Sequence, residues 1–468
     1  MSVAQRAWGA VPDSVKESDR QLIAGVLLFT YLLYILAQTF LAIANNAAIL
    51  PAVANSLQNI TFLIAVYAIM ALALNLHWGY TGLFNIGIAG FMAVGVYSMS
   101  ILAAPATGSP PGLGLPIPVA VVGAVAITAL VGGLAALPAL QLDADYLAIV
   151  TVGFSEIIRL VLNASYFAGT VQDPEASGYN VVDIFGIQFG TGGGQGINTP
   201  TSSPADFLYS TTSLGDLLYG PSGDPNALGS AVYAAAESVG VNSSVVNGAT
   251  YSFFLLLVVV TLYYVLLVRI GNSPFGRVLK AIREDELVAQ SLGKDTRWFK
   301  VKVFMVGCAL MGLGGILWQG SFGFVNPNTF RPIVTFYIFT ALIVGGAGSN
   351  TGSVIGGAVF AAFLFEGPRQ LARIVEVLVT SVFGSLPSPT TFYAAVVSLN
   401  PLAWLGYTID NVSTLKFVFL GAVLVYLMQN RSDGLLGHRK EIAASIDLSD
   451  RTPRKRESSA ADGGESDE

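Results

Sequence analysis

Long runs of apolar residues, separated by shorter polar stretches, make up most of this sequence. The hydrocarbon core of a bilayer is about 30 Å thick and takes roughly 20 residues of α-helix to cross. Apolar runs that approach or reach this length occur at Leu22–Ala44, Leu57–Leu76, Leu83–Ala103, Ile117–Leu137, Tyr146–Phe167, Tyr251–Val268, Val301–Gly320 and Leu415–Met428. A water-soluble protein would need a very large core to bury all of these runs. We therefore predict an all-α polytopic membrane protein.

Two shorter apolar pieces, Ile333–Val344 and Val354–Phe365, flank a glycine-rich stretch at 345–352. They either cross the membrane as two short helices or form one re-entrant hairpin. The chain then has about ten transmembrane helices, or eight plus the hairpin. Gly352 and Gly356 have the small-xxx-small spacing that is typical of close helix packing.

The distribution of Lys and Arg predicts the orientation, because cytoplasmic loops carry an excess of both. Arg269–Lys302 holds eight basic residues in 34 positions, whereas Ala168–Thr250 holds none. We expect a cytoplasmic loop at 269–302 and an extracellular loop at 168–250. Basic residues beside the first and last spans place 1–21 and 431–468 in the cytoplasm. The transmembrane region then covers 22–430, and the composition of the tail is typical of disorder.

Leu22–Ala44 is too long for the apolar core of a signal peptide, so we interpret it as the first retained span. Segment Gly367–Asp410 is apolar in places but is interrupted by Pro387, Pro389 and Pro401. We interpret it as an insertion at the outer membrane surface. Two additional crossings are the alternative.

The composition argues against most kinds of catalysis. Only 11% of the residues are charged, against about 25% in soluble domains. Cys308 is the only cysteine and the chain has two histidines, so neither an intrachain disulfide nor a Cys- or His-based metal site is expected. No catalytic constellation is evident. We expect no cofactor, no metal and no nucleic-acid partner.

The stretch Gly271–Val278 resembles a phosphate-binding loop only in its glycine spacing. It lacks the Lys that contacts the phosphates and the Ser or Thr that binds magnesium. If ATP drives this protein, the ATPase is therefore another chain.

The basic loop also contains a predicted helix, Gly276–Leu292, which Gly293 would end. Apolar residues and an acidic cluster on one short helix are suited to docking into a partner's groove. A merely solvated loop is the alternative. The residues predicted to couple to the partner are Leu279, Ile282, Arg283, Glu284, Asp285, Glu286, Ala289 and Gly293.

Polar residues inside predicted spans are candidates for function, because they are costly in a membrane. Glu156 and Arg159 share one helix face and can pair. The pair is either structural or in contact with a zwitterionic substrate or a partner permease. Tyr80 and Asn85 lie beside a glycine-rich break, where exposed backbone can line a pathway.

Five stretches resemble, in the same order, motifs of the permease subunits of branched-chain amino acid ABC importers, in particular the LivM type. They are Asn75–Gly87, Asp145–Arg159, Thr191–Ile197, Ser273–Phe304 and Gly345–Gly357. The resemblance covers roughly residues 57–200 and 251–366 and resumes at Leu415–Gly437. The segments around 201–250 and 367–410 and the tail depart from the pattern.

This resemblance implies a multi-subunit importer in the plasma membrane. Its other members would be a second homologous permease, two ABC ATPase subunits and an extracellular substrate-binding protein. ATP-driven closure of the ATPases would act on the loop at 269–302 and switch the access of the spans. Branched-chain amino acids are the expected substrate, with urea or short-chain amides as alternatives. A self-sufficient ion-coupled secondary transporter is the rival class.

The orientation can be tested with cysteines at Ser203 and Ser291, introduced after replacement of Cys308. An impermeant thiol reagent should label the first from outside the cell and the second only from inside. Labelling of both cysteines from outside would contradict the predicted orientation.

Overall fold

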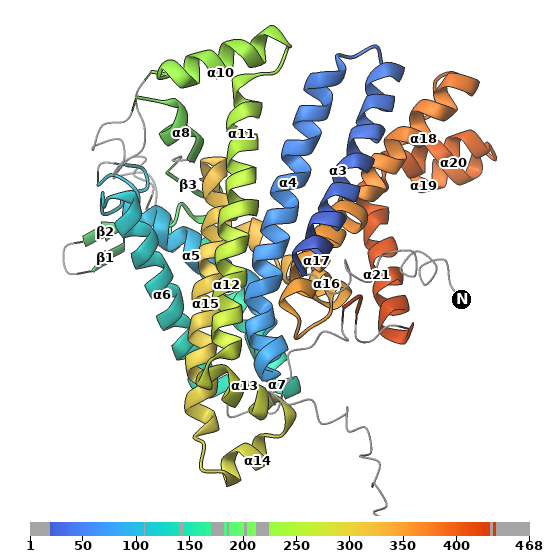
Figure 1. Ribbon diagram of the computed structural model, residues 1–468. Helices are drawn as coiled ribbons and strands as arrows, with labels where there is room; N and C mark the ends of the chain where they lie inside the picture. Colours follow the sequence, from blue (N-terminus) through green and yellow to red (C-terminus); the bar gives the residue numbers. More distant parts are fainter. Residues whose placement is uncertain are drawn as a thin grey trace, which may run out of the picture.

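The computed structural model describes residues 19–106, 108–139, 144–169, 182–184, 187–200, 204–211, 224–430 and 434–436 (Figure 1). Helices make up most of it, so the all-α class predicted from the sequence is confirmed. Most of the predicted N-terminal segment and nearly all of the tail lie outside the described residues.

The longer helices form an upright bundle, in which several are continued by single π-helical turns. They are α3 (Asp19–Ala44), α4 (Ile49–Leu74), α5 (Ile88–Ala103), α6 (Ile117–Ala139), α7 (Ala144–Asn163), α11 (Ser243–Phe254), α12 (Val260–Asn272), α15 (Thr296–Gln319), α16 (Pro332–Gly345), α17 (Asn350–Val359), α18 (Gly367–Phe383) and α21 (Val412–Asn430). The π-helical turns are Asn75–Gly79, Leu255–Val259 and Phe360–Phe365.

Shorter elements lie at the two ends of this bundle. The short helices are α8 (Pro204–Tyr209), α10 (Ala227–Ser238), α13 (Pro274–Glu284), α14 (Glu286–Ser291), α19 (Phe392–Val397) and α20 (Pro401–Asp410). Strands β1 (Val182–Ile184) and β2 (Ile187–Phe189) pair antiparallel, as do β3 (Ile197–Asn198) and β4 (Phe324–Val325). The 3-10 turns are Ser165–Phe167, Gly193–Gln195, Gly320–Phe322 and Pro327–Phe330.

Seven helical stretches in the described part of the chain are long and apolar enough to cross a membrane. They are Asp19–Ala44, Ile49–Gly79, Ile117–Pro138, Tyr146–Asn163, Ser243–Asn272, Thr296–Gln319 and Asn350–Phe383. Three more apolar helices are shorter: Ile88–Ala103, Pro332–Gly345 and Lys416–Tyr426. The multi-pass character is confirmed, and the number of crossings stays a prediction. Several predicted boundaries are wrong. Residues 83–87 are not helical and α7 ends at Asn163, and the helices predicted to begin at Leu57 and Tyr251 begin at Ile49 and Ser243.

Helix α4 is the centre of the bundle, because neighbouring helices pack around most of its surface. At glycines, the backbones of neighbouring helices in this bundle come close together. A Cβ at Gly357 of α17 would lie 2.6 Å from the Ala68 nitrogen, and a Cβ at Gly95 of α5 would lie 2.3 Å from the Gly312 oxygen of α15. Such contacts between small residues are a main source of helix association in membranes.

The predicted hairpin at 333–365 has two unequal arms. A Cβ at Gly356 would lie 2.1 Å from the Ala341 oxygen, so the expected packing role of this glycine is confirmed. Helix α16 has 14 residues and is about 21 Å long, which is less than the thickness of a bilayer core. The second arm continues through a π-helical turn into α18 as a 34-residue stretch, Asn350–Phe383.

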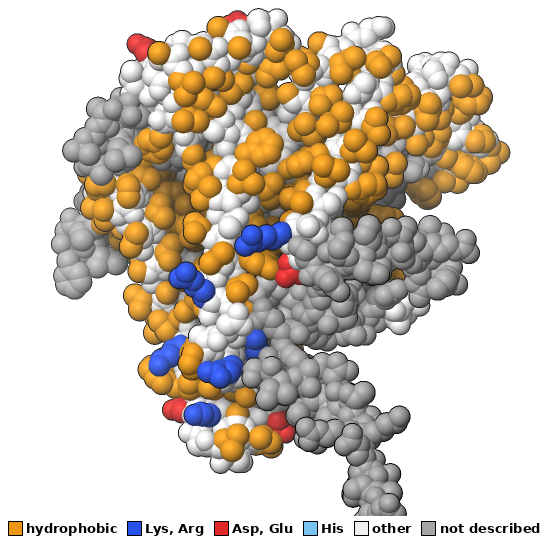
Figure 2. Space-filling model, in the orientation of Figure 1, with side chains coloured by type: hydrophobic (Ala, Val, Ile, Leu, Met, Phe, Trp, Pro, Cys, Tyr) orange, Lys and Arg blue, Asp and Glu red, His pale blue; other side chains and the backbone are white. Residues whose placement is uncertain are grey.

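The two predicted loops lie at opposite ends of the bundle, with α10 at one end and α13 and α14 at the other (Figure 1). Lys and Arg side chains gather toward the end with α14 on the face in Figure 2. Helices α18, α19 and α20 lie toward the end with α10. Neither α19 nor α20, with 6 and 10 residues, is long enough to cross a bilayer.

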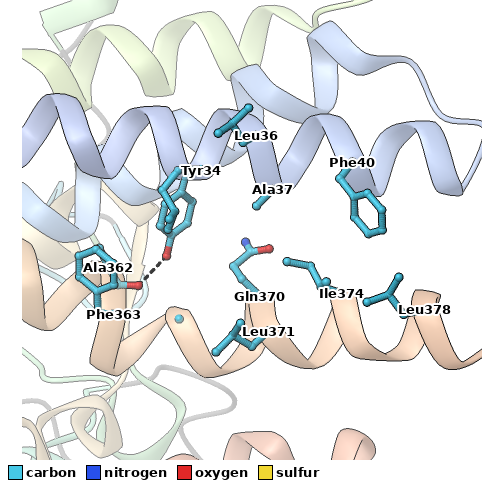
Figure 3. A pocket seen from close by; sticks show the side chains of 12 residues that line it. Tyr34, Leu36, Ala37, Phe40, Ala362, Phe363, Gln370, Leu371, Ile374 and Leu378 are labelled. Carbon is cyan, nitrogen blue, oxygen red and sulfur yellow. Dashed lines mark hydrogen bonds between the residues drawn. The ribbon is translucent and has the colours of Figure 1, made fainter. Parts of the chain in front are cut away.

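A groove of about 640 Å³ lies between α3 and α18 (Figure 3). The Tyr34 hydroxyl of α3 donates to the Ala362 carbonyl, in the π-helical turn before α18, at 2.8 Å. Gln38 of α3 donates to Gln370 of α18 at 3.0 Å. The remaining lining is almost entirely aliphatic or aromatic.

Candidate functional site

The two glycine-rich breaks in the sequence contact each other. Helix α4 continues through the π-helical turn Asn75–Gly79 to Thr81, and residues 82–87 are then irregular until α5 begins at Ile88. The Gly348 nitrogen, in the turn between α16 and α17, donates to Asn75 Oδ1 at 2.8 Å. A Cβ at Gly79 would lie 2.7 Å from that nitrogen, so only glycine fits there. The local sequence patterns did not predict this contact.

A chain of buried side chains holds the breaks together. Asn75 Nδ2 donates to Asn350 Oδ1 at 3.0 Å, and Asn350 Nδ2 donates to the Tyr80 hydroxyl at 2.7 Å. The Tyr80 hydroxyl in turn donates to the Leu267 carbonyl of α12 at 3.2 Å. Tyr80, a predicted pathway residue, is completely buried. In this conformation it joins helices instead of lining an open path.

Asn85 is also buried, beside a histidine that sequence reasoning did not single out. His77 Nε2 lies 3.2 Å from the carbonyl oxygens of Val303 and Phe304, and Nδ1 lies 3.2 Å from Asn85 Nδ2. Carbonyl oxygens only accept, so these contacts assign the proton of a neutral imidazole to Nε2. Asn85 Oδ1 accepts from the Gly87 nitrogen at 2.8 Å. The pair therefore fastens the irregular segment to α15.

The coupling segment, which we define as residues 274–293, consists of two helices. The prediction of one helix over Gly276–Leu292 is wrong, because Asp285 is extended with φ −157° between α13 and α14. Its Oδ1 accepts from the Val288 nitrogen at 3.0 Å, which is the capping geometry that aspartate favours at a helix start. Gly293, with φ +74°, follows the second helix as expected.

The apolar residues of the coupling segment face two ways. Leu279, Ile282 and Ala289 are buried within this chain, at 4% exposure or less. The expectation that Leu279 and Ile282 fill a partner's groove is therefore wrong. Leu287 and Leu292 are 74% and 73% exposed, so they form the apolar surface that a partner can reach.

The inner side of the coupling segment contacts the break after α4. Arg283 Nη1 donates to the Gly79 carbonyl at 2.5 Å. The Lys280 ammonium lies 5.5 Å from the centre of the Tyr80 ring, within the range of a cation–π contact. This segment and the buried network are therefore continuous.

The acidic cluster of the segment has partners inside this chain. Glu284 Oε1 lies 2.6 Å from Arg283 Nη2, and Glu286 Oε2 lies 2.5 Å from Lys300 Nζ. Asp285 caps α14. All three acids thus help to shape the coupling segment.

The predicted pairing of Glu156 and Arg159 on α7 is confirmed. Arg159 Nε donates to Glu156 Oε2 at 2.9 Å, and Nη2 donates to Oε1 at 2.5 Å. Arg159 Nη1 also donates to Asn328 Oδ1 at 2.7 Å, in the 3-10 turn that precedes α16. The side chains are 35% and 15% exposed, respectively, so the pair lies at the surface of this chain.

Comparison with known proteins identifies the family. Residues 56–364 match the model of the permease component of branched-chain amino acid transport systems. The chain belongs to this family. The matched region contains the break, the coupling segment and the ion pair of α7.

The chain is 30% identical to the high-affinity branched-chain amino acid permease protein LivM of Escherichia coli K12 over 320 residues, which are 67% of this chain and 63% of that protein. It is 26% identical over 318 residues to a probable LivM of Methanocaldococcus jannaschii, covering 62% and 75% of the two chains. It is 31% identical over 146 residues to the E. coli K12 permease protein LivH, covering 29% and 45%. No solved structure matches.

Replacement of Asn350 by Ala should destabilise the protein, because it removes the bonds from Asn75 and to Tyr80. Hydrogen bonds between membrane helices average about 0.6 kcal/mol and reach about 1.7 kcal/mol, so we expect a loss of about 1–3 kcal/mol. Denaturant titration in detergent measures it. Tyr80→Phe, which removes only the hydroxyl, should cost less. An unchanged unfolding midpoint for Asn350→Ala would contradict the role of the network.

Proposed function

We propose that this chain is the permease subunit of an ATP-binding-cassette importer and forms, with a second homologous permease, the pathway for branched-chain amino acids. Family membership supports this, as does the similarity to both LivM and LivH, which are named as separate permease proteins. The chain spans about 63% of the length of E. coli LivM. ATP hydrolysis would reside in two separate ATPase subunits, and an extracellular binding protein would deliver the substrate.

The observation that carries this proposal is the two-sided coupling segment. Leu287 of α14 and Leu292, which follows this helix, are exposed at the end of the bundle, whereas Arg283 of α13 binds the Gly79 carbonyl. Buried apolar anchors dominate most protein interfaces. An ATPase groove that takes the two leucines would therefore bear directly on the segment that contacts the broken span.

Movement of the coupling segment would act on a part of the membrane region that is suited to rearrangement. The turn Asn75–Gly79 is π-helical, and such turns are frequent at functional sites. Gly82 follows it with φ +72°, a conformation that favours glycine. A shift of Arg283 would change the contacts of Gly79 and Tyr80, and through Asn350 those of the turn between α16 and α17.

The double variant Leu287→Ser and Leu292→Ser should weaken ATPase binding without harming the fold, because both side chains are exposed. Interface anchors typically contribute 2 kcal/mol or more, which corresponds to roughly a 30-fold loss of affinity. Co-purification and uptake measure the effect. Leu228→Ser, at an exposed leucine of α10 on the opposite end, is the control. Normal ATPase binding by the double variant would contradict the docking surface.

Arg283→Gln should separate binding from coupling. The exposed leucines remain, so the ATPases should still co-purify, but the bond to Gly79 and the positive charge are lost. We expect uptake to fall at least tenfold while ATP hydrolysis by the complex becomes independent of substrate. Uptake at the wild-type rate would contradict transmission through Arg283. Uptake by the chain alone, driven by an ion gradient, would favour a secondary transporter.

A further inference from the structure

Helix α7 exposes an apolar stripe with a charged pair at its edge. The stripe consists of Tyr146, Ile149, Val150, Ile157, Leu160 and Val161. The Glu156 side chain, beside it, is about one-third exposed. Ionised groups within membrane spans almost always face a protein interior or a water-filled cavity, because a charge in contact with lipid is costly. The exposed face of α7 is therefore expected to meet water or protein.

A second guanidinium belongs to the segment that binds Arg159. Arg331 precedes α16 directly and follows the 3-10 turn whose Asn328 binds Arg159. It is exposed, and it lies within electrostatic reach of the Glu156 carboxylate. Within the described part of the chain its guanidinium has no hydrogen bond or ion pair. One carboxylate that is partly exposed and one accessible guanidinium thus stand together beside an apolar stripe.

The groove in Figure 3 and the buried network around Asn75 offer no such combination. The groove between α3 and α18 is lined by apolar groups and a Gln370 side chain that Gln38 already binds. The network around Asn75 and Asn350 is buried and occupied by its own hydrogen bonds. Neither presents opposite charges to a small molecule.

We propose that the exposed face of α7 lines the substrate pathway, with Glu156 contacting the ammonium group and Arg331 the carboxylate of a zwitterionic amino acid. The apolar stripe would contact the aliphatic side chain of this amino acid. Arg159 is a positioning residue, because it holds the Glu156 carboxylate from two nitrogens and is itself held by Asn328. This inference rests on the proposed function, and the second permease would close the pathway on its other side.

The reactivity of introduced cysteines tests whether water reaches the exposed face of α7 in the assembled complex. Single cysteines at Ile157 and Leu160, in a Cys308→Ala background, are compared with cysteines at Leu130 and Leu262, which are similarly exposed on α6 and α12. A charged, membrane-impermeant methanethiosulfonate should react at least tenfold faster with the α7 cysteines, and leucine should slow that reaction. Rates equal to those of the controls would overturn the inference.

Arg331→Gln tests the ligand contact. The cysteine at 157 should stay reactive in this variant, but saturating leucine should no longer slow its reaction, and uptake should fall at least tenfold. Arg331→Lys should restore part of the protection. Arg369→Gln, at an exposed arginine of α18, is the control and should change neither. Full protection by leucine in Arg331→Gln would overturn the assignment.

The position of the charges can also be reversed. The double variant Glu156→Arg and Arg159→Glu retains an ion pair, so it should express like wild type but carry less than a tenth of the substrate. Uptake at the wild-type rate would show that the pair is only structural and would overturn the inference. A wild-type complex that binds its ATPases but carries no amino acid would overturn the proposed function as well, which distinguishes the two failures.

Discussion

Irregular backbone at membrane depth must find its hydrogen bonds within the protein, because lipid offers none. This constraint accounts for the side-chain hydrogen bonds to the segment between α4 and α5. The Ile86 nitrogen donates to Thr151 Oγ1 at 3.0 Å, the Gly87 nitrogen to Asn85 Oδ1 at 2.8 Å, and the Ala89 nitrogen to Thr335 Oγ1 at 3.1 Å. Side chains from the segment itself, α7 and α16 thus bind backbone nitrogens of this segment and of the first turn of α5.

The same constraint ties distant helices to one point. Asn75 binds the turn between α16 and α17, and His77 binds the backbone of α15. The coupling segment meets this point through Arg283. A conformational change that opens the break must exchange several of these bonds together, and this favours two discrete arrangements over a continuous deformation. The break is therefore well placed to switch the access of a pathway.

The sequence predicted the helices better than their contacts. Apolar runs are long enough to identify most spans, but composition did not show that residues 83–87 leave the helix, since Leu83, Phe84 and Ile86 are as apolar as the span itself. The contact between the breaks depends on tertiary packing, which a local sequence pattern does not report. The Glu156–Arg159 pair was predictable, because helical spacing fixes it. Its attachment to Asn328, 169 residues further on, was not.

Asp285 illustrates why the coupling segment needs two helices. A short polar side chain can bond to nearby backbone and so compete with a continuing helix, and here it caps α14. The interruption allows α13 to lie along this chain, with Leu279 and Ile282 buried, while α14 projects from the end of the bundle (Figure 1). Glu284 and Glu286 form ion pairs on either side of the interruption. Exposed pairs of this kind contribute only about 0–1 kcal/mol, so their effect is chiefly on geometry. Affinity for a partner would then come from the leucines of α14 and transmission from the cations of α13, and one straight helix could not separate the two tasks as cleanly.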